Sequence, residues 1–300
     1  MKIPSLVVIF VIPLVCANAQ VTQPPLSQRQ ACERFTSAVV RIEAGGKSRG
    51  TGFLVTQDGF ILTAGHVITD PESGKFFSAI LVSLPSGASE LARVVIPMTL
   101  DTSGQDYAIL KVDGKDKLPF IPLGTNEDII VGSNATIVGY PFSAITVEDR
   151  HVSTKFCLSA IVAASDLVAV PIRGTKRIGQ QNVPVKADVK VNVIYFQGPS
   201  VKGVSGAPLI SLDTGNVIGI VTLKLTGIGN ALNEMRNNAT AGRSSIAISG
   251  IGDLNAAFSG IIQVLDEQLA NGLGAAVGID DPAYALKKAT RDDERQHPKK

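Results

Sequence analysis

The sequence predicts an all-β protein made of two units of similar size, followed by one helix. Three observations lead to this prediction. The 300 residues include 29 glycines and no tryptophan, and Val and Ile are plentiful, which favours short strands joined by tight turns. Short apolar segments separated by turn residues then occur in two sets. After the second set, residues 253–269 carry apolar side chains at helical spacing.

The first unit is expected between residues 37 and 128. An Asp58-Gly59 pair separates two of its segments and is a strong hairpin signal. Short segments at this spacing are typical of a small antiparallel barrel or sandwich. The predicted strands are residues 37–44, 50–55, 60–63, 77–84, 91–97 and 107–112.

The second unit is expected between residues 129 and 270, after a connector that contains Pro119 and Pro122. The predicted strands are residues 134–139, 155–163, 189–196, 207–211, 217–225 and 245–248. The amphipathic segment 253–269 should form a helix that packs on this unit. Residues 271–300 are rich in glycine and then in charge, and we expect them to form a flexible tail.

The first residues have the pattern of a secretory signal peptide, residues 1–19. Lys2 precedes the apolar run 6–15, and the small residues 17–19 form a cleavage site after Ala19. A membrane anchor would need an apolar run of about 20 residues, and the bulky Val15 argues against a lipoprotein anchor at Cys16. We therefore expect a leader at residues 20–36 and a mature chain that is secreted or periplasmic, with no membrane span.

Charge and cysteine content limit the partners. The formal net charge is +2, and Lys and Arg form no dense block before the last residues, so we expect no nucleic-acid partner. Cleavage of the signal would leave Cys32 and Cys157. They could pair in an oxidising compartment, or could be one buried and one exposed thiol. The sequence does not predict an oligomeric state.

Three residues carry the chemistry. His66 follows a predicted strand and a Thr-Ala-Gly turn, although it could be an ordinary hydrogen-bonded histidine. Asp106 stands directly before an apolar strand, where a buried carboxylate needs a donor, although it could be a turn residue. Ser205 lies between Val204 and Gly206 in "KGVSGAPLI", which alone could be a tight turn. Together they supply a nucleophile, a base and an orienting acid.

The three motifs resemble those of chymotrypsin/trypsin-like serine peptidases, and most closely the bacterial HtrA-like branch. "TAGHV" resembles the histidine motif, "DYAILKV" the aspartate motif and "GVSGAPLI" the serine motif, within residues 37–248. The resemblance implies two six-stranded antiparallel β-barrels with the site between them. It also implies a catalytic His66–Asp106–Ser205 triad and an oxyanion hole formed by the N–H groups of Gly203 and Ser205. Too few residues follow position 270 to hold the PDZ domains that such proteases usually carry.

Two departures from the family pattern concern the serine motif. Val204 stands where the family commonly has Asp or Asn, and Ala207 replaces a glycine. Val204 cannot pair with a new N-terminus, so we expect no activation by that ion pair, and a poorly formed oxyanion hole would slow the enzyme. The substrate pocket is expected near Pro199. No acidic residue lies between positions 195 and 205, which favours a small or medium apolar residue before the cut.

These observations predict an exported serine endopeptidase that acts on protein or peptide substrates and needs no metal or cofactor. Two alternatives stay open at this stage. One is a weak or inactive relative that binds peptides or proteins, in which the polar stretch 173–188 forms a loop over the cleft. The other is an esterase-type hydrolase, although Ala207 and the chain order differ from the usual esterase pattern.

Overall fold

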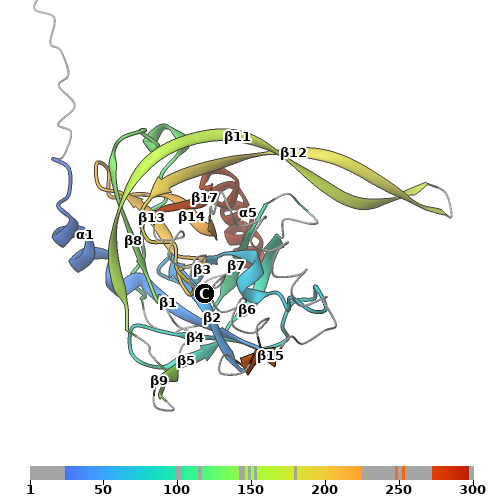
Figure 1. The fold of residues 1–300 in the computed structure, drawn as a ribbon, viewed down its shortest axis with the longest axis horizontal. Helices are drawn as coiled ribbons and strands as arrows, with labels where there is room; N and C mark the ends of the chain where they lie inside the picture. The colour runs from blue at the N-terminus through green and yellow to red at the C-terminus, as the bar shows by residue number, and fades with distance from the viewer. Residues whose placement is uncertain are drawn as a thin grey trace, which may run out of the picture.

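The computed structural model describes residues 24–98, 103, 105–113, 117–141, 146–147, 150–151, 154–178, 181–224, 247–248, 252–253 and 272–296. Its main body consists of two antiparallel sheets and a helix near the C-terminus (Figure 1). The predicted all-β fold with two antiparallel units is therefore confirmed. The predicted signal peptide, nearly all of the helix predicted at 253–269 and part of the strand predicted at 245–248 lie outside the described residues.

The first sheet has seven strands in the order β5-β4-β1-β2-β3-β7-β6. Their bounds are β1 Val39–Ala44, β2 Lys47–Leu54, β3 Phe60–Thr63, β4 Ile80–Ser83, β5 Ser89–Leu91, β6 Arg93–Met98 and β7 Tyr107–Lys111. A seventh strand arises because the segment predicted at 91–97 is divided at Ala92, whose N–H donates to Ile80. β5 and β6 thus end the sheet on opposite sides but follow each other in the chain, which bends the sheet toward a barrel.

The second sheet is a closed barrel of six strands in the order β11-β12-β17-β14-β13-β8. Their bounds are β8 Asn134–Gly139, β11 Phe156–Ile178, β12 Gln181–Gln197, β13 Pro208–Ser211, β14 Val217–Lys224 and β17 Leu273–Gly278. Inward-facing apolar side chains such as Ile137, Ile194 and Leu209 fill it. Four short strands, β9 Thr146–Val147 with β10 Arg150–His151 and β15 Ala247–Ile248 with β16 Gly252–Asp253, form two separate two-stranded sheets.

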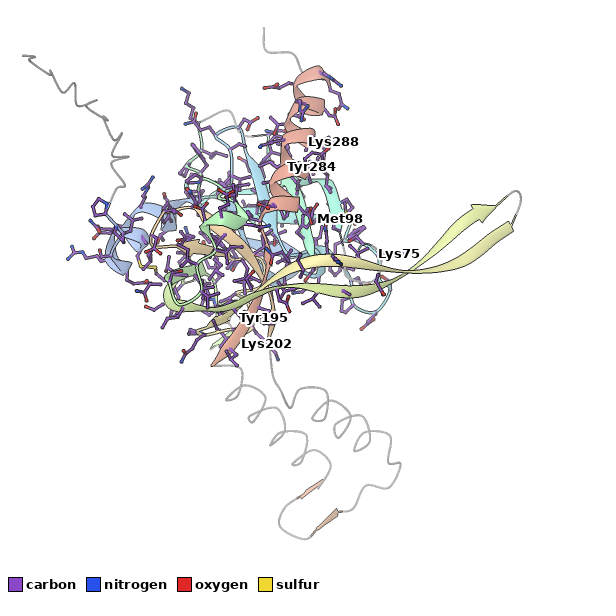
Figure 2. The ribbon with its side chains drawn as sticks, turned by 90° about the horizontal axis from the view of Figure 1, so that it is seen from above. Lys75, Met98, Tyr195, Lys202, Tyr284 and Lys288 are labelled. Atoms are coloured by element: carbon purple, nitrogen blue, oxygen red, sulfur yellow. A yellow bond between two sulfur atoms is a disulfide. The ribbon has the colours of Figure 1, made fainter. Side chains whose placement is uncertain are left out.

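β11 and β12 continue well past the barrel as one long antiparallel ribbon. Their register runs from Ile161 opposite Gln197 to Ile178 opposite Gln181. Figures 1 and 2 show this ribbon standing away from both sheets. The stretch 173–188, interpreted from sequence as a loop over the cleft, is therefore strand wherever it is described. β-branched residues on both strands, for example Val170 and Val189, favour this extended form.

The prediction of a flexible tail after residue 270 is wrong for residues 272–296. Residues 273–278 are strand β17 of the barrel, and α5 (Asp280–Gln296) follows directly. Pro282, Ala285, Leu286 and Ala289 lie on one face of α5 and are buried, and the last three pack in the core of the first sheet. Figure 2 labels Tyr284 and Lys288 on this helix. The buried apolar residues of α5 have helical spacing in the sequence, but the many charged residues between and after them favoured the interpretation as a solvated tail.

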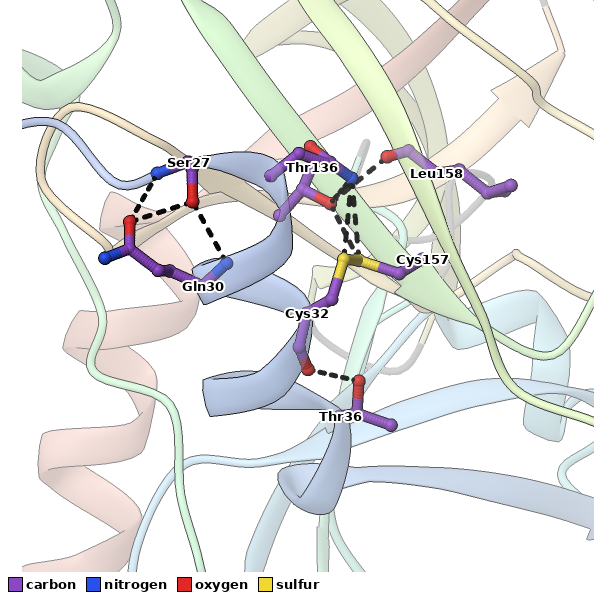
Figure 3. Close-up of a disulfide and its surroundings, with 8 residues drawn as sticks. Ser27, Gln30, Cys32, Thr36, Thr136, Cys157 and Leu158 are labelled. Atoms are coloured by element: carbon purple, nitrogen blue, oxygen red, sulfur yellow. Dashed lines mark hydrogen bonds between the residues drawn. A yellow bond between two sulfur atoms is a disulfide. The ribbon is translucent and has the colours of Figure 1, made fainter.

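The N-terminal helix α1 (Gln28–Phe35) ties the two units together. Ser27 caps it through a reciprocal capping box with Gln30. Its buried Phe35 belongs to the core of the first unit, whereas its Cys32 forms a disulfide with Cys157 of β11 (Figure 3). The structure also has three short 3-10 helices: η1 Thr36–Ala38, η2 Gly65–Ile68 and η3 Asn126–Asp128.

Candidate active site

Strand pairing brings His66 and Asp106 together. β3 and β7 are antiparallel neighbours, so the turn after β3 meets the residue that precedes β7. Asp106 Oδ2 lies 2.6 Å from His66 Nδ1, and Asp106 Oδ1 accepts a 2.9 Å hydrogen bond from the His66 backbone N–H. The carboxylate is 2% exposed and the imidazole 47%. Asp106 therefore holds both the ring and the backbone of His66, and leaves Nε2 for another partner.

Gly65 makes this approach possible. A Cβ at residue 65 would lie 1.9 Å from the carbonyl oxygen of Met98 and 3.1 Å from Asp106 Oδ1. No side chain fits in that space, so only glycine lets η2 begin here and set the imidazole beside the buried carboxylate. The glycine before His66 in "TAGHV" is thus required by the approach of the Met98 carbonyl.

The surroundings of His66 act on its pKa in opposite directions. Burial of the ring lowers the pKa, whereas the hydrogen bond and the negative charge of Asp106 raise it, and the net pKa lies above the ordinary value of 6.5. A carboxylate that accepts from Nδ1–H also fixes the tautomer in which Nε2 can accept a proton. This is the arrangement that a general base needs.

Ser205 lies in the turn between β12 and β13, on the second unit. Gly203 and Gly206 have φ of 99° and 84°, the left-handed region that favours glycine. A Cβ at Gly206 would lie 2.1 Å from the Thr51 carbonyl oxygen and 2.9 Å from the Ala64 nitrogen. The serine turn is therefore packed against the segment that leads into His66. Among the described residues, no hydrogen bond joins Ser205 to His66.

The backbone around Ser205 leaves two donors available to a ligand. The N–H groups of Gly203 and Ser205 donate to no acceptor in the described part of the chain, whereas those of Val204 and Gly206 donate to Val201 and Val221. Val204 is 1% exposed and packs in the barrel core. The apolar residue at this family position is thus explained by the interior of the barrel, which its side chain helps to fill.

Sequence reasoning missed Thr51. This β2 residue is fully buried and contacts the serine turn through its backbone and its hydroxyl group. A threonine in a strand is ordinary, and nothing in "GTGFLV" indicates a partner in the other unit. The adjacent Gly50 is a weak signal, because a Cβ there would lie 2.7 Å from the Ser205 carbonyl oxygen.

The expected pocket residue Pro199 is half-buried in the loop that follows β12. Next to it, Ser200 is buried, and Gly274 of β17 lies so close that a Cβ there would come within 2.3 Å of the Phe196 ring and 2.9 Å of Ser200.

Within the described ranges, no group of three or more His, Cys, Asp or Glu residues is placed to hold a metal ion.

Comparison with known proteins identifies the family. The model of the trypsin-like peptidase domain matches residues 50–220, more than half of the chain. The chain belongs to the trypsin-like peptidase family. This trypsin-like peptidase is similar to a solved structure, the serine endoprotease from Yersinia pestis. The two superpose with a TM-score of 0.54 over 90% of this chain and 69% of the Yersinia chain. At 20% identity, that likeness supports the fold alone.

Curated relatives are serine proteases by name. Serine protease HTRA1 of Xenopus tropicalis is 33% identical over 61% of this trypsin-like peptidase and 33% of its own length. A probable periplasmic serine endoprotease, DegP-like, of Pseudomonas fluorescens is 30% identical over 82% of the chain and 44% of its own length. The chain thus spans about a third to a half of these relatives. The HtrA-related character predicted from the sequence is confirmed.

Proposed function

We propose that this protein is an exported serine endopeptidase in which His66, Asp106 and Ser205 form the catalytic triad. The observation that carries the proposal is the double contact of buried Asp106 with the ring and backbone of His66, beside the turn that presents Ser205. The serine protease relatives support the same class of reaction. A triad hydrogen bond that is absent without substrate is compatible with this role, because such bonds tighten in the Michaelis complex.

The reaction begins with Ser205. Its Oγ attacks the carbonyl carbon of the scissile peptide bond while His66 Nε2 takes the hydroxyl proton, and Asp106 stabilises the imidazolium that forms. The carbonyl oxygen becomes an oxyanion, which the N–H groups of Gly203 and Ser205 would bind. His66 then gives its proton to the leaving amine, which leaves an acyl ester on Ser205. A water molecule activated by His66 attacks that ester and releases the second product.

The substrate preference follows from the loop after β12. The Phe196 ring and Ser200 pack closely on Gly274, and no carboxylate lies between residues 195 and 205. We therefore propose cleavage after a small or medium apolar residue, with Pro199 at the pocket. Export rests on the signal-like residues 1–19 and on the DegP-like relative, whose name describes a periplasmic protein. Among the described residues, no helix combines the length and apolar composition needed to cross a membrane.

A fluorophosphonate probe tests the nucleophile. The probe should label the wild type and fail on Ser205→Ala, which should also lose casein turnover. Ser165→Ala is the matched control, because this exposed serine lies on β11 and, among the described residues, its hydroxyl donates to Asn192 and not to the candidate site. Equal labelling of wild type and Ser205→Ala would remove Ser205 from the mechanism. A wild type that neither reacts nor cleaves would instead be a protease-like binding protein.

A further inference from the structure

Thr51 lies at the boundary of the two units and makes four hydrogen bonds there. Its N–H donates to the Ser205 carbonyl at 2.9 Å, and its Oγ1 donates to the Gly203 carbonyl at 2.7 Å. The same Oγ1 accepts from the Tyr140 N–H at 3.0 Å, and the Thr51 carbonyl accepts from Thr63 Oγ1 at 2.7 Å. Both hydrogen-bonding functions of the buried hydroxyl group are therefore in use.

These bonds fix the peptide groups around the nucleophile. The carbonyls of Gly203 and Ser205 are bound by Thr51, and the carbonyl of Val204 between them accepts from the Ala207 N–H at 2.8 Å. Three successive carbonyls are thus held. Because the N–H and C=O of one peptide group point in opposite directions, holding the carbonyls also sets the direction of the N–H groups. The N–H of Ser205 shares its peptide group with the Val204 carbonyl, so Thr51 holds the peptide groups on both sides of this donor.

We infer that Thr51 is a positioning residue, which fixes the peptide groups on both sides of the Ser205 N–H and so orients this donor of the proposed oxyanion hole. The inference rests on the proposed function of Ser205. Gly50 permits the close contact, since a Cβ there would lie 2.7 Å from the Ser205 carbonyl oxygen. Valine has the shape of threonine without its hydroxyl group. At position 51 it would leave the Gly203 carbonyl and the Tyr140 N–H without a partner in the interior, so the turn would shift to satisfy them.

The effect should appear in the chemical step. An oxyanion hole binds charge that develops in the transition state, so a misdirected donor lowers kcat and has little effect on KM. Loss of a whole donor costs about 100- to 1000-fold in kcat. Since Thr51→Val misdirects the Ser205 N–H without removing it, we expect kcat to fall about 10- to 100-fold. The second-order rate of fluorophosphonate labelling, which also places an oxygen in the hole, should fall in parallel.

Thr51→Ser provides the rescue and Thr136→Val the matched control. Serine keeps the hydroxyl group, so Thr51→Ser should stay within about threefold of the wild type in kcat. Thr136 is a fully buried threonine on β8, and its described hydrogen bonds join Gln28, Cys157 and Leu158 and not the serine turn. Thr136→Val should destabilise the fold without lowering kcat. If Thr51→Val does not fold, Thr51→Cys is the second variant. Its thiol is a weak donor, so its kcat should lie between that of Thr51→Ser and complete loss of activity.

The inference is overturned if folded Thr51→Val keeps wild-type kcat, if only its KM changes, or if Thr51→Ser or Thr51→Cys contradicts this ranking. The failure of the proposed function has a different signature. In that case Ser205→Ala matches the wild type in labelling and turnover, whatever residue occupies position 51.

Discussion

Replacing Gly65 with Ala tests how closely His66 must be held. The added Cβ would lie 1.9 Å from the carbonyl oxygen of Met98, whereas Cβ atoms in proteins essentially never come within 3.0 Å of such an atom. Residue 65 or the Met98 carbonyl must therefore move by more than about 1 Å. Met98 ends β6 and is paired with Tyr107, which follows Asp106, so the displacement passes to the His66–Asp106 pair. A misplacement of about 1 Å costs about 100-fold in rate, and we expect this loss in kcat/KM.

The assay is cleavage of a fluorogenic peptide with an apolar residue before the scissile bond, together with circular dichroism to verify the fold. Gly87→Ala is the control. Gly87 has φ of 85°, and no neighbouring atom lies within 4 Å of the place that an alanine Cβ would take, so alanine strains an exposed turn without adding a contact. It should lose some stability and no activity. Folded Gly65→Ala enzyme with more than a third of the wild-type kcat/KM would refute the reasoning.

Two further predictions concern pH and the disulfide. Because the pKa of His66 is raised above 6.5 and catalysis needs the neutral ring, kcat/KM should fall on acidification with a midpoint above 6.5, and a lower midpoint would contradict this. The same raised pKa favours the folded state below pH 6.5, a contribution that is lost as pH rises through the folded-state pKa. Replacing Cys32 and Cys157 with Ser opens a link across 125 residues and should lower the free energy of unfolding by about 2–4 kcal/mol in urea titrations. Reductant should have the same effect on the wild type and none on the double variant; equal stability of all four samples would be the contrary result.

The parts of the site that could be predicted are those written in short local motifs. His66, Asp106 and Ser205 each lie beside a strand whose apolar pattern is clear, and the predicted strand 60–63 coincides with β3. Chain order then assigns the histidine and the acid to one unit and the serine to the other. The glycines at positions 65 and 206 stand in these motifs too, but the contacts that require them come from distant segments, Met98 for Gly65 and Thr51 for Gly206.

The parts that could not be predicted depend on contacts between distant segments. Thr51 reaches Gly203 across 152 residues, and a strand threonine has no local signal for such a partner. The helix α5 was missed for a similar reason. Its four buried side chains are buried because the helix packs against β6 and β7, which are distant in the sequence. In the sequence alone, Asp292, Asp293 and Arg295 give the segment the composition of a solvated tail.

The position of β17 in the barrel determines when the proposed peptidase could become active. This strand lies between β12 and β14, although it follows them both in the chain. The barrel therefore cannot close until residues 273–278 have been synthesised, long after the segment that carries Ser205. A nascent chain would carry Ser205, the proposed nucleophile, on an unfinished sheet. We expect such a chain to be unable to cut the unfolded polypeptides around it.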